Sequence, residues 1–320
     1  MTTSGSVDFN ATRNEIIRGA LRKIGAIASG ETPDAQTISD CAFALNAMVK
    51  HWDTKGIHVW TESEGILFLQ PGQVQYELGT GTTDHAAYAL DNVNTTLTAN
   101  AAAGDTTLNV VSTSGISGGD IVGIVLDSGT VQWTTTPGGG TTTTIVIADP
   151  LTGSASSGNN IYTYTTDLIR PLRVPFGRRF YFLSSIDTPM ITMSRKDYRD
   201  LPNKTATGII TQFFYDPRGG ANTQGLVYVW PAPVDANSAL KFTWYRPIQD
   251  FDSAANTPDL PQEWIQTLMF NLAVIMAPEY DCPPQRFQML VNMAASCLDD
   301  VTGWDRETES TYFGVNFDQR

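Results

Sequence analysis

Thr12-Arg-Asn-Glu-Ile-Ile-Arg-Gly-Ala-Leu-Arg-Lys-Ile-Gly25 is the stretch, close to the start of the chain, that decides the class of fold. Thr12 and Glu15 have the spacing of a capping box, in which two side chains satisfy free backbone groups at a helix N-terminus. Apolar residues then recur at helical spacing until Gly25, a residue type that commonly ends helices. The stretch predicts an amphipathic helix, and its apolar face needs other elements to cover it.

Three further segments have the same helical pattern. One follows Thr32-Pro33 and stops at Gly56, one opens at Pro261, and one follows Pro283-Pro284. Their apolar stripes are, in order, Ile38, Cys41, Ala42, Leu45, Met48, Val49 and Trp52; Trp264, Ile265, Leu268, Leu272, Ile275 and Met276; and Phe287, Leu290, Val291, Ala294, Cys297, Leu298 and Val301. Because no single helix buries its own stripe, we expect the N-terminal pair to pack against the C-terminal pair.

The middle of the chain predicts strands. Alternating runs such as Thr107-Leu-Asn-Val-Val111 and Ile121-Val-Gly-Ile-Val-Leu126 are separated by turns rich in glycine. The expected fold class is therefore α+β: a helical bundle built from the N-terminal and C-terminal helices, with a β-rich middle and an inserted small β barrel or sandwich.

Changes in composition predict the domain limits. Residues 1–60 and 261–300 would be the helical parts of the body, 61–90 and 166–260 its β-rich part, 91–165 the inserted β domain, and 301–320 an extended tail. The tail holds four large aromatic residues, Trp304, Tyr312, Phe313 and Phe317. A tail without a core of its own is normally polar, so we expect these side chains either to anchor in a partner or to fold back on their own subunit.

The distribution of charge says more than the net charge of −13. No lysine or arginine occurs from Gly56 to Ile169, which excludes this stretch as a DNA-gripping surface because phosphates are bound by cations. We expect the cations that follow to lie at a subunit interface, because the chain supplies its own acidic counterpart. This basic cluster is Arg170, Arg173, Arg178, Arg179, Arg195, Lys196, Arg199 and Lys204.

Signatures of catalysis are missing from the sequence. The three histidines match no HExxH motif, no Gly-x-Ser-x-Gly elbow occurs, and the three cysteines have no CxxC spacing. We therefore assign no catalytic, cofactor-binding or metal-binding residue and expect no cofactor. The chain also has no run of about 18 apolar residues, so we expect no membrane span and no membrane partner.

Two alternatives stay open at this point. A glycosidase needs only two carboxylates facing across a cleft, and acidic pairs occur at Glu62 and Glu64, at Asp250 and Asp252, and at Glu279 and Asp281. The chain would then be a peptidoglycan-degrading virion hydrolase. The other alternative is a carbohydrate-binding virion module, in which Trp133 with Tyr162 or Tyr164 would offer flat faces to a sugar.

Five segments of the sequence resemble those of a known family. They are Asn14-Glu-Ile-Ile-Arg-Gly-Ala-Leu-Arg-Lys-Ile-Gly25, Ser194-Arg-Lys-Asp-Tyr-Arg-Asp-Leu-Pro-Asn-Lys204, Thr211-Gln-Phe-Phe-Tyr-Asp-Pro217, Val227-Tyr-Val-Trp-Pro-Ala-Pro233 and Pro258-Asp-Leu-Pro-Gln-Glu-Trp264. Together they resemble the tail accessory factors of short-tailed bacteriophages, also called packaged-DNA stabilisation proteins, over roughly residues 10 to 300.

The resemblance implies a structural head-to-tail adaptor without enzymatic activity. Such a subunit would be made in the host cytoplasm and would join the virion, where an expected twelve copies form a ring beneath the portal protein. The ring would extend the DNA channel, help to close it after packaging, and seat a tail nozzle, fibre or plug protein. DNA would pass without sequence-specific binding. The residues that grip the portal would be those of the C-terminal extension: Trp304, Tyr312, Phe313, Phe317 and Arg320.

Overall fold

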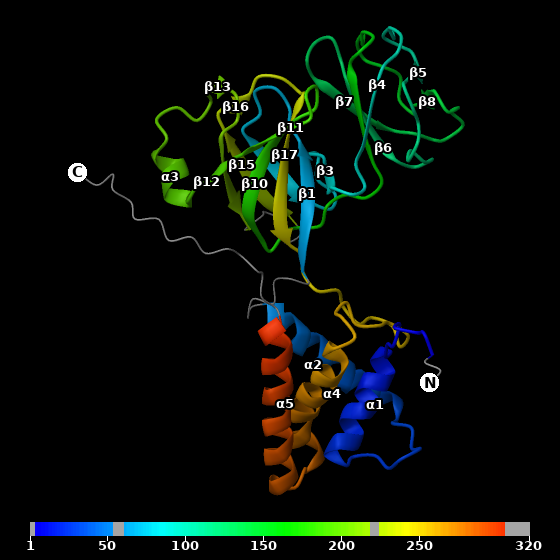
Figure 1. Ribbon diagram of the computed structural model, residues 1–320, viewed down its shortest axis with the longest axis vertical. Coiled ribbons are helices and arrows are strands. Elements are labelled where there is room, and N and C mark those ends of the chain that lie inside the picture. The colour runs from blue at the N-terminus through cyan, green and yellow to red at the C-terminus, as the bar shows by residue number, and fades with distance from the viewer. Residues whose placement is uncertain (1–3, 54–60, 218–223, 305–320) are drawn as a thin grey trace, which may run out of the picture. The chain divides into compact units, whose positions relative to one another are not determined.

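The chain folds into a helical unit and a β unit, shown in Figure 1. The structure, a computed structural model, describes residues 4–53, 61–217 and 224–304. Its contacts assign Met1–Thr61 and Pro247–Arg320 to the helical unit and Glu62–Arg246 to the β unit. This is the mixed α+β architecture that the sequence predicts, with N-terminal and C-terminal helices together and the strands between them.

The helical unit consists of α1 (Arg13–Ile24), α2 (Ala35–Asp53), α4 (Trp264–Met276), a short 3-10 helix (Ala277–Tyr280) and α5 (Pro284–Trp304). Both predicted ends of α1 are confirmed. Thr12 and Glu15 form the reciprocal capping box, and Gly25 ends the helix in the left-handed conformation with φ of 89°. Helix α4 lies between α1 and α5 (Figure 1).

The core of the helical unit draws on all of these helices. The two indole rings of Trp52 in α2 and Trp264 in α4 meet with ring centroids 5.7 Å apart. Leu21 of α1 and Leu290 of α5 are buried in the same cluster. The predicted packing of the N-terminal pair against the C-terminal pair is therefore confirmed.

The body of the β unit is built from two sheets. The five-stranded sheet has the order β11-β10-β17-β1-β3 and the four-stranded sheet the order β12-β14-β15-β2. Their strands are β1 (Glu62–Phe68), β2 (Gln75–Gly79), β3 (Ala86–Tyr88), β10 (Arg173–Tyr181), β11 (Ile186–Pro189), β12 (Ile191–Thr192), β14 (Gln212–Asp216), β15 (Gln224–Trp230) and β17 (Ser238–Tyr245), with β13 (Thr207–Gly208) and β16 (Ala232–Pro233) paired beside them.

Alternation along the strands places the core between these two sheets. Leu240, Phe242 and Trp244 of β17 share one face of the five-stranded sheet and are buried against Phe213 of β14 and Val227 of β15. The β unit therefore has a hydrophobic core distinct from that of the helices.

The inserted domain is a small sandwich. Its strands are β4 (Val93–Thr96), β5 (Thr107–Asn109), β6 (Ile121–Val125), β7 (Val131–Thr135), β8 (Thr144–Val146) and β9 (Asn160–Tyr164). A sheet of order β4-β9-β6-β7 and the two-stranded sheet β5-β8 share one buried cluster, which includes Leu108, Ile124 and Ile161. Among the described strands no barrel closes, so of the two expected forms the insert takes the sandwich.

Two local features differ from the sequence-based expectation. A short helix, α3 (Arg195–Asp200), begins at a capping box between Ser194 and Asp197, within a block to which we assigned no secondary structure. Helix α5 continues to Trp304, whereas the extended tail was predicted to start at residue 301. The predicted domain limits within the β unit stay a prediction, since the contacts group 62–246 as one unit.

Candidate functional site

The basic cluster lies on two neighbouring stretches of the β unit. Strand β10 carries Arg173, Arg178 and Arg179, and α3 carries Arg195, Lys196 and Arg199, while Arg170 precedes β10 and Lys204 follows α3. Within this cluster Arg173, Lys196 and Arg199 are exposed.

Many of these cations bind groups of their own chain. Arg195 forms an ion pair of 2.8 Å with Asp216, whose carboxylate is almost completely buried. Arg178 pairs with Glu64 at 2.6 Å, and Lys196 with Asp200 at 2.6 Å.

Two more cations of the basic cluster donate hydrogen bonds to backbone carbonyls. The Arg170 guanidinium donates to the carbonyl of Pro217 at 3.1 Å, and the Lys204 ammonium donates to the carbonyls of Arg199 and Leu201 at 3.0 and 3.1 Å. Three of the eight cations are therefore paired with carboxylates of their own subunit, while Arg170 and Lys204 keep their charge. Its role at a subunit interface stays a prediction.

The predicted portal contacts fall at the C-terminal end of the chain. Trp304 is the last residue of α5. Tyr312, Phe313, Phe317 and Arg320 lie outside the described residues.

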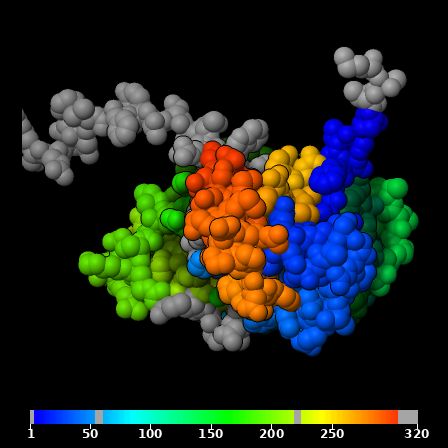
Figure 2. Space-filling view, turned by 90° about the horizontal axis from the view of Figure 1, so that it is seen from below, coloured from blue at the N-terminus to red at the C-terminus, as the bar shows by residue number. Residues whose placement is uncertain are grey.

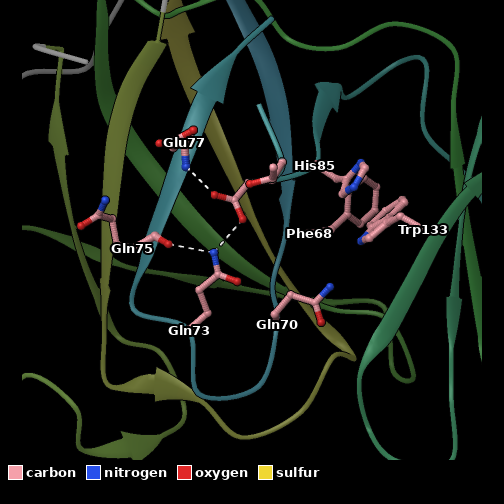
Figure 3. Close-up of a pocket in the computed structure, with 9 residues that line it drawn as sticks. Phe68, Gln70, Gln73, Gln75, Glu77, His85 and Trp133 are labelled. Atoms are coloured by element: carbon pink, nitrogen blue, oxygen red, sulfur yellow. Dashed lines mark hydrogen bonds between the residues drawn. The ribbon is translucent and has the colours of Figure 1, made fainter. Parts of the chain in front are cut away.

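A polar pocket of about 430 Å³ lies where the insert meets the body (Figure 3). Its floor is aromatic: the rings of His85 and Trp133 stack with centroids 3.9 Å apart, and Phe68 packs on Trp133 at 5.2 Å. Its wall is held by Asp84, which accepts hydrogen bonds from the Gln73 side chain at 2.6 Å and from the backbone of Glu77 at 2.7 Å.

A chain of three side chains supports this floor. The Tyr164 hydroxyl donates to the Asp167 carboxylate at 3.0 Å and lies 2.7 Å from Nδ1 of His85. Since its own proton is committed to Asp167, Tyr164 accepts the Nδ1 proton, which leaves Nε2 of a neutral His85 unprotonated. Burial lowers the pKa of His85 to about 4 and raises the pKa of Tyr164. The arrangement holds the insert against the body.

The aromatic residues expected to stack on a sugar are used internally. Tyr162 and Tyr164 are buried, and the Tyr162 hydroxyl donates to the carbonyl of Ala236 at 2.7 Å. One face of Trp133 lies against His85, and its ring also lies close over Gly123 of the neighbouring strand. The pocket thus lacks the open aromatic face on which sugar stacking depends.

Two of the three acidic pairs considered for hydrolysis have one member that is engaged with its own chain. Glu64 binds Arg178, and Asp250 binds Lys50 at 2.9 Å. Within the described residues no group of three or more His, Cys, Asp or Glu side chains is placed to hold a metal ion. In that same part of the chain, no helix is long and apolar enough to cross a membrane.

The helical unit has a groove that the sequence did not reveal. It lies between α2 and α4, measures about 720 Å³, and is lined by Phe43, Ala47, Val274 and Ile275 among others. Phe43 is 78% exposed and Ile275 is 43% exposed. One sequence signal could have indicated the groove: Phe43 is a large apolar residue outside the apolar stripe of its helix. Ile275 gave no such signal, because it was assigned to the apolar stripe of α4.

Comparison with known proteins gives no family assignment. No protein-family model matches this chain, and no curated protein matches it significantly.

Proposed function

We propose that the chain is a structural adaptor subunit of a phage virion, without enzymatic activity. An expected twelve copies form a ring beneath the portal protein, extend the DNA channel and help to close it after packaging. The ring seats a tail nozzle, fibre or plug protein on its other side.

The observation that carries this proposal is the make-up of the helical unit. Segments from the beginning and from the end of the chain fold together into this one compact unit. Its helices also leave large apolar side chains in water, namely Phe43, Ile275, Met289 and Met293. Phe43 and Ile275 line one groove, and exposed apolar groups that lie together are typical of surfaces that bind another protein.

The charges support a channel through which DNA slides. The chain has no lysine or arginine from Gly56 to Ile169. Of the eight cations that follow, Arg178, Arg195 and Lys196 are paired with carboxylates of their own subunit. A surface with few free cations releases few counterions on meeting DNA and therefore holds it weakly.

The test is sedimentation of the purified chain, alone and mixed with its cognate portal. We expect a small species that moves to the portal fraction only when portal is present. A chain truncated after Trp304 keeps α5 complete and is expected to lose portal binding, since the proposed anchors Tyr312, Phe313 and Phe317 are removed.

Two full-length variants test whether the aromatic side chains, rather than the mere presence of the C-terminal segment, are needed for portal binding. Replacing Tyr312, Phe313 and Phe317 by alanine is expected to abolish portal binding. Replacing the polar residues Thr308, Ser310 and Thr311 of the same segment by alanine is expected to leave it intact. Equal binding by both variants would reject the aromatic anchors, and no binding by the unaltered chain would reject the adaptor function.

A further inference from the structure

The groove between α2 and α4 has an acidic rim. Phe43 of α2 and Ile275 of α4 present their apolar side chains there. Asp40 and Glu279 lie at its edge, and both residues are exposed. None of the described residues that line the groove is a lysine or an arginine. We refer to Asp40, Phe43, Ile275 and Glu279 as the acid-rimmed groove.

A second surface of the same unit has the opposite character. On α5, Met289 is 57% exposed and Met293 is 42% exposed. Arg286 lies on the same helical face, three and seven residues before them, and its guanidinium donates to the carbonyl of Ile24 at 2.8 Å. This face of α5 is therefore turned toward α1. Figure 2 shows the orange surface of α5 next to the blue surface of the N-terminal residues.

A further cation belongs to this second surface. Lys23 of α1 lies 3.7 Å above the ring of Phe270 in α4. Together Lys23, Arg286, Met289 and Met293 form what we call the methionine ridge. It lies on the α1 side of α4 and α5, whereas the acid-rimmed groove lies on the α2 side of α4.

The two surfaces complement each other in charge, and both expose apolar side chains. The groove is an apolar hollow bordered by carboxylates, and the ridge carries apolar methionines next to cations. Methionine and aromatic residues are enriched at protein interfaces, and opposite charges at the border fix the register of the partners. Because the two surfaces are different patches of one chain, their contact joins copies head to tail. A head-to-tail contact that closes generates a ring.

We propose that the acid-rimmed groove of one copy receives the methionine ridge of the next copy. The inference rests on the proposed ring and names the surfaces that build it. The contact lies on the helical unit, while the basic cluster lies on the β unit.

Disulfide trapping tests the contact directly. Phe43→Cys and Met293→Cys are made separately in a chain whose partly exposed Cys282 and Cys297 are serine. The two variants are mixed, with portal and without it at high concentration, and oxidised. We expect a cross-linked dimer from this mixture, and a ladder of cross-linked species from a chain that carries both substitutions.

The matched control replaces Met293→Cys by Ala295→Cys, which is exposed on another face of the same helix. A yield no higher than that of the control, in a chain that still binds portal, would overturn the inference and leave the adaptor function standing. No cross-link and no portal binding would overturn both. A specific cross-link without portal binding would support the contact and overturn the adaptor function.

Discussion

At the scale of single residues, the carboxylate of Asp216 is an almost completely buried member of an ion pair in the β unit. It faces the Arg195 guanidinium at 2.8 Å. Asp216→Asn keeps the shape and removes the charge, and we expect a loss of about 1–3 kcal/mol in the free energy of unfolding, because the partly buried Arg195 guanidinium loses its carboxylate partner. Urea denaturation measures the loss.

The control is the exposed pair of Lys196 and Asp200. Lys196→Ala is expected to cost less than about 0.5 kcal/mol, as is usual for exposed helix pairs. Equal losses for Asp216→Asn and Lys196→Ala would contradict the role given to burial.

A second prediction at this scale concerns His85. Burial lowers its pKa from 6.5 to about 4. Between these values the unfolded chain binds more protons than the folded chain, so stability decreases as the pH falls from 7 toward 4. We expect His85 to account for about 2 kcal/mol of this decrease, after a discount for partial exposure.

His85→Phe keeps a flat ring against Trp133 and removes the titrating group. Urea unfolding at pH 7 and at pH 4.5 compares the two chains. The variant is expected to lose less stability between the two pH values than the unaltered chain. The same loss in both chains would show that His85 is not held neutral.

At the scale of elements, the capping box of α1 makes a contribution to stability that can be measured by itself. The Thr12 hydroxyl accepts from the backbone of Glu15, and the Glu15 carboxylate accepts from the backbone of Thr12 at 2.8 Å. Thr12→Ala is expected to cost about 1 kcal/mol, and Thr12→Ser, which keeps the cap, only a few tenths. Thermal unfolding followed by circular dichroism measures both, and equal losses would contradict the capping contribution.

The junction of the insert with the body gives another prediction. Phe68 of β1 stacks on Tyr162 of the insert with ring centroids 5.2 Å apart. Phe68→Ala removes a buried ring and is expected to destabilise the β unit by about 3–5 kcal/mol. Phe176→Ala, at an exposed position of β10, is the control and is expected to change stability little. A small effect of Phe68→Ala would show that the insert is held by other contacts.

Elements were predictable from the sequence where their signals are local. Thr12 and Gly25 mark the ends of α1, and both signals directly adjoin the helix. The short α3 was missed because six residues are too few for a helical period to show. The burial of Tyr162 was not predictable, because its partner Ala236 lies 74 residues away. The groove was missed for the same reason, since α2 and α4 are far apart in sequence.

At the scale of the whole molecule, the two units have separate hydrophobic cores. We therefore expect two unfolding transitions that respond to different substitutions. Leu272→Ala, in the core of the helical unit, is expected to lower only one transition, and Val227→Ala, in the core of the β unit, only the other. Calorimetry measures both, and a single transition shifted by either substitution would contradict separate cores.

The proposed function requires that copies of this chain form a ring on a portal. The measurement that tests it most directly is the mass of the portal complex by native mass spectrometry. We predict that the mass saturates with one chain of 34.8 kDa for each portal subunit. A portal that gains no mass, or that gains chains without reaching this ratio, would contradict the account.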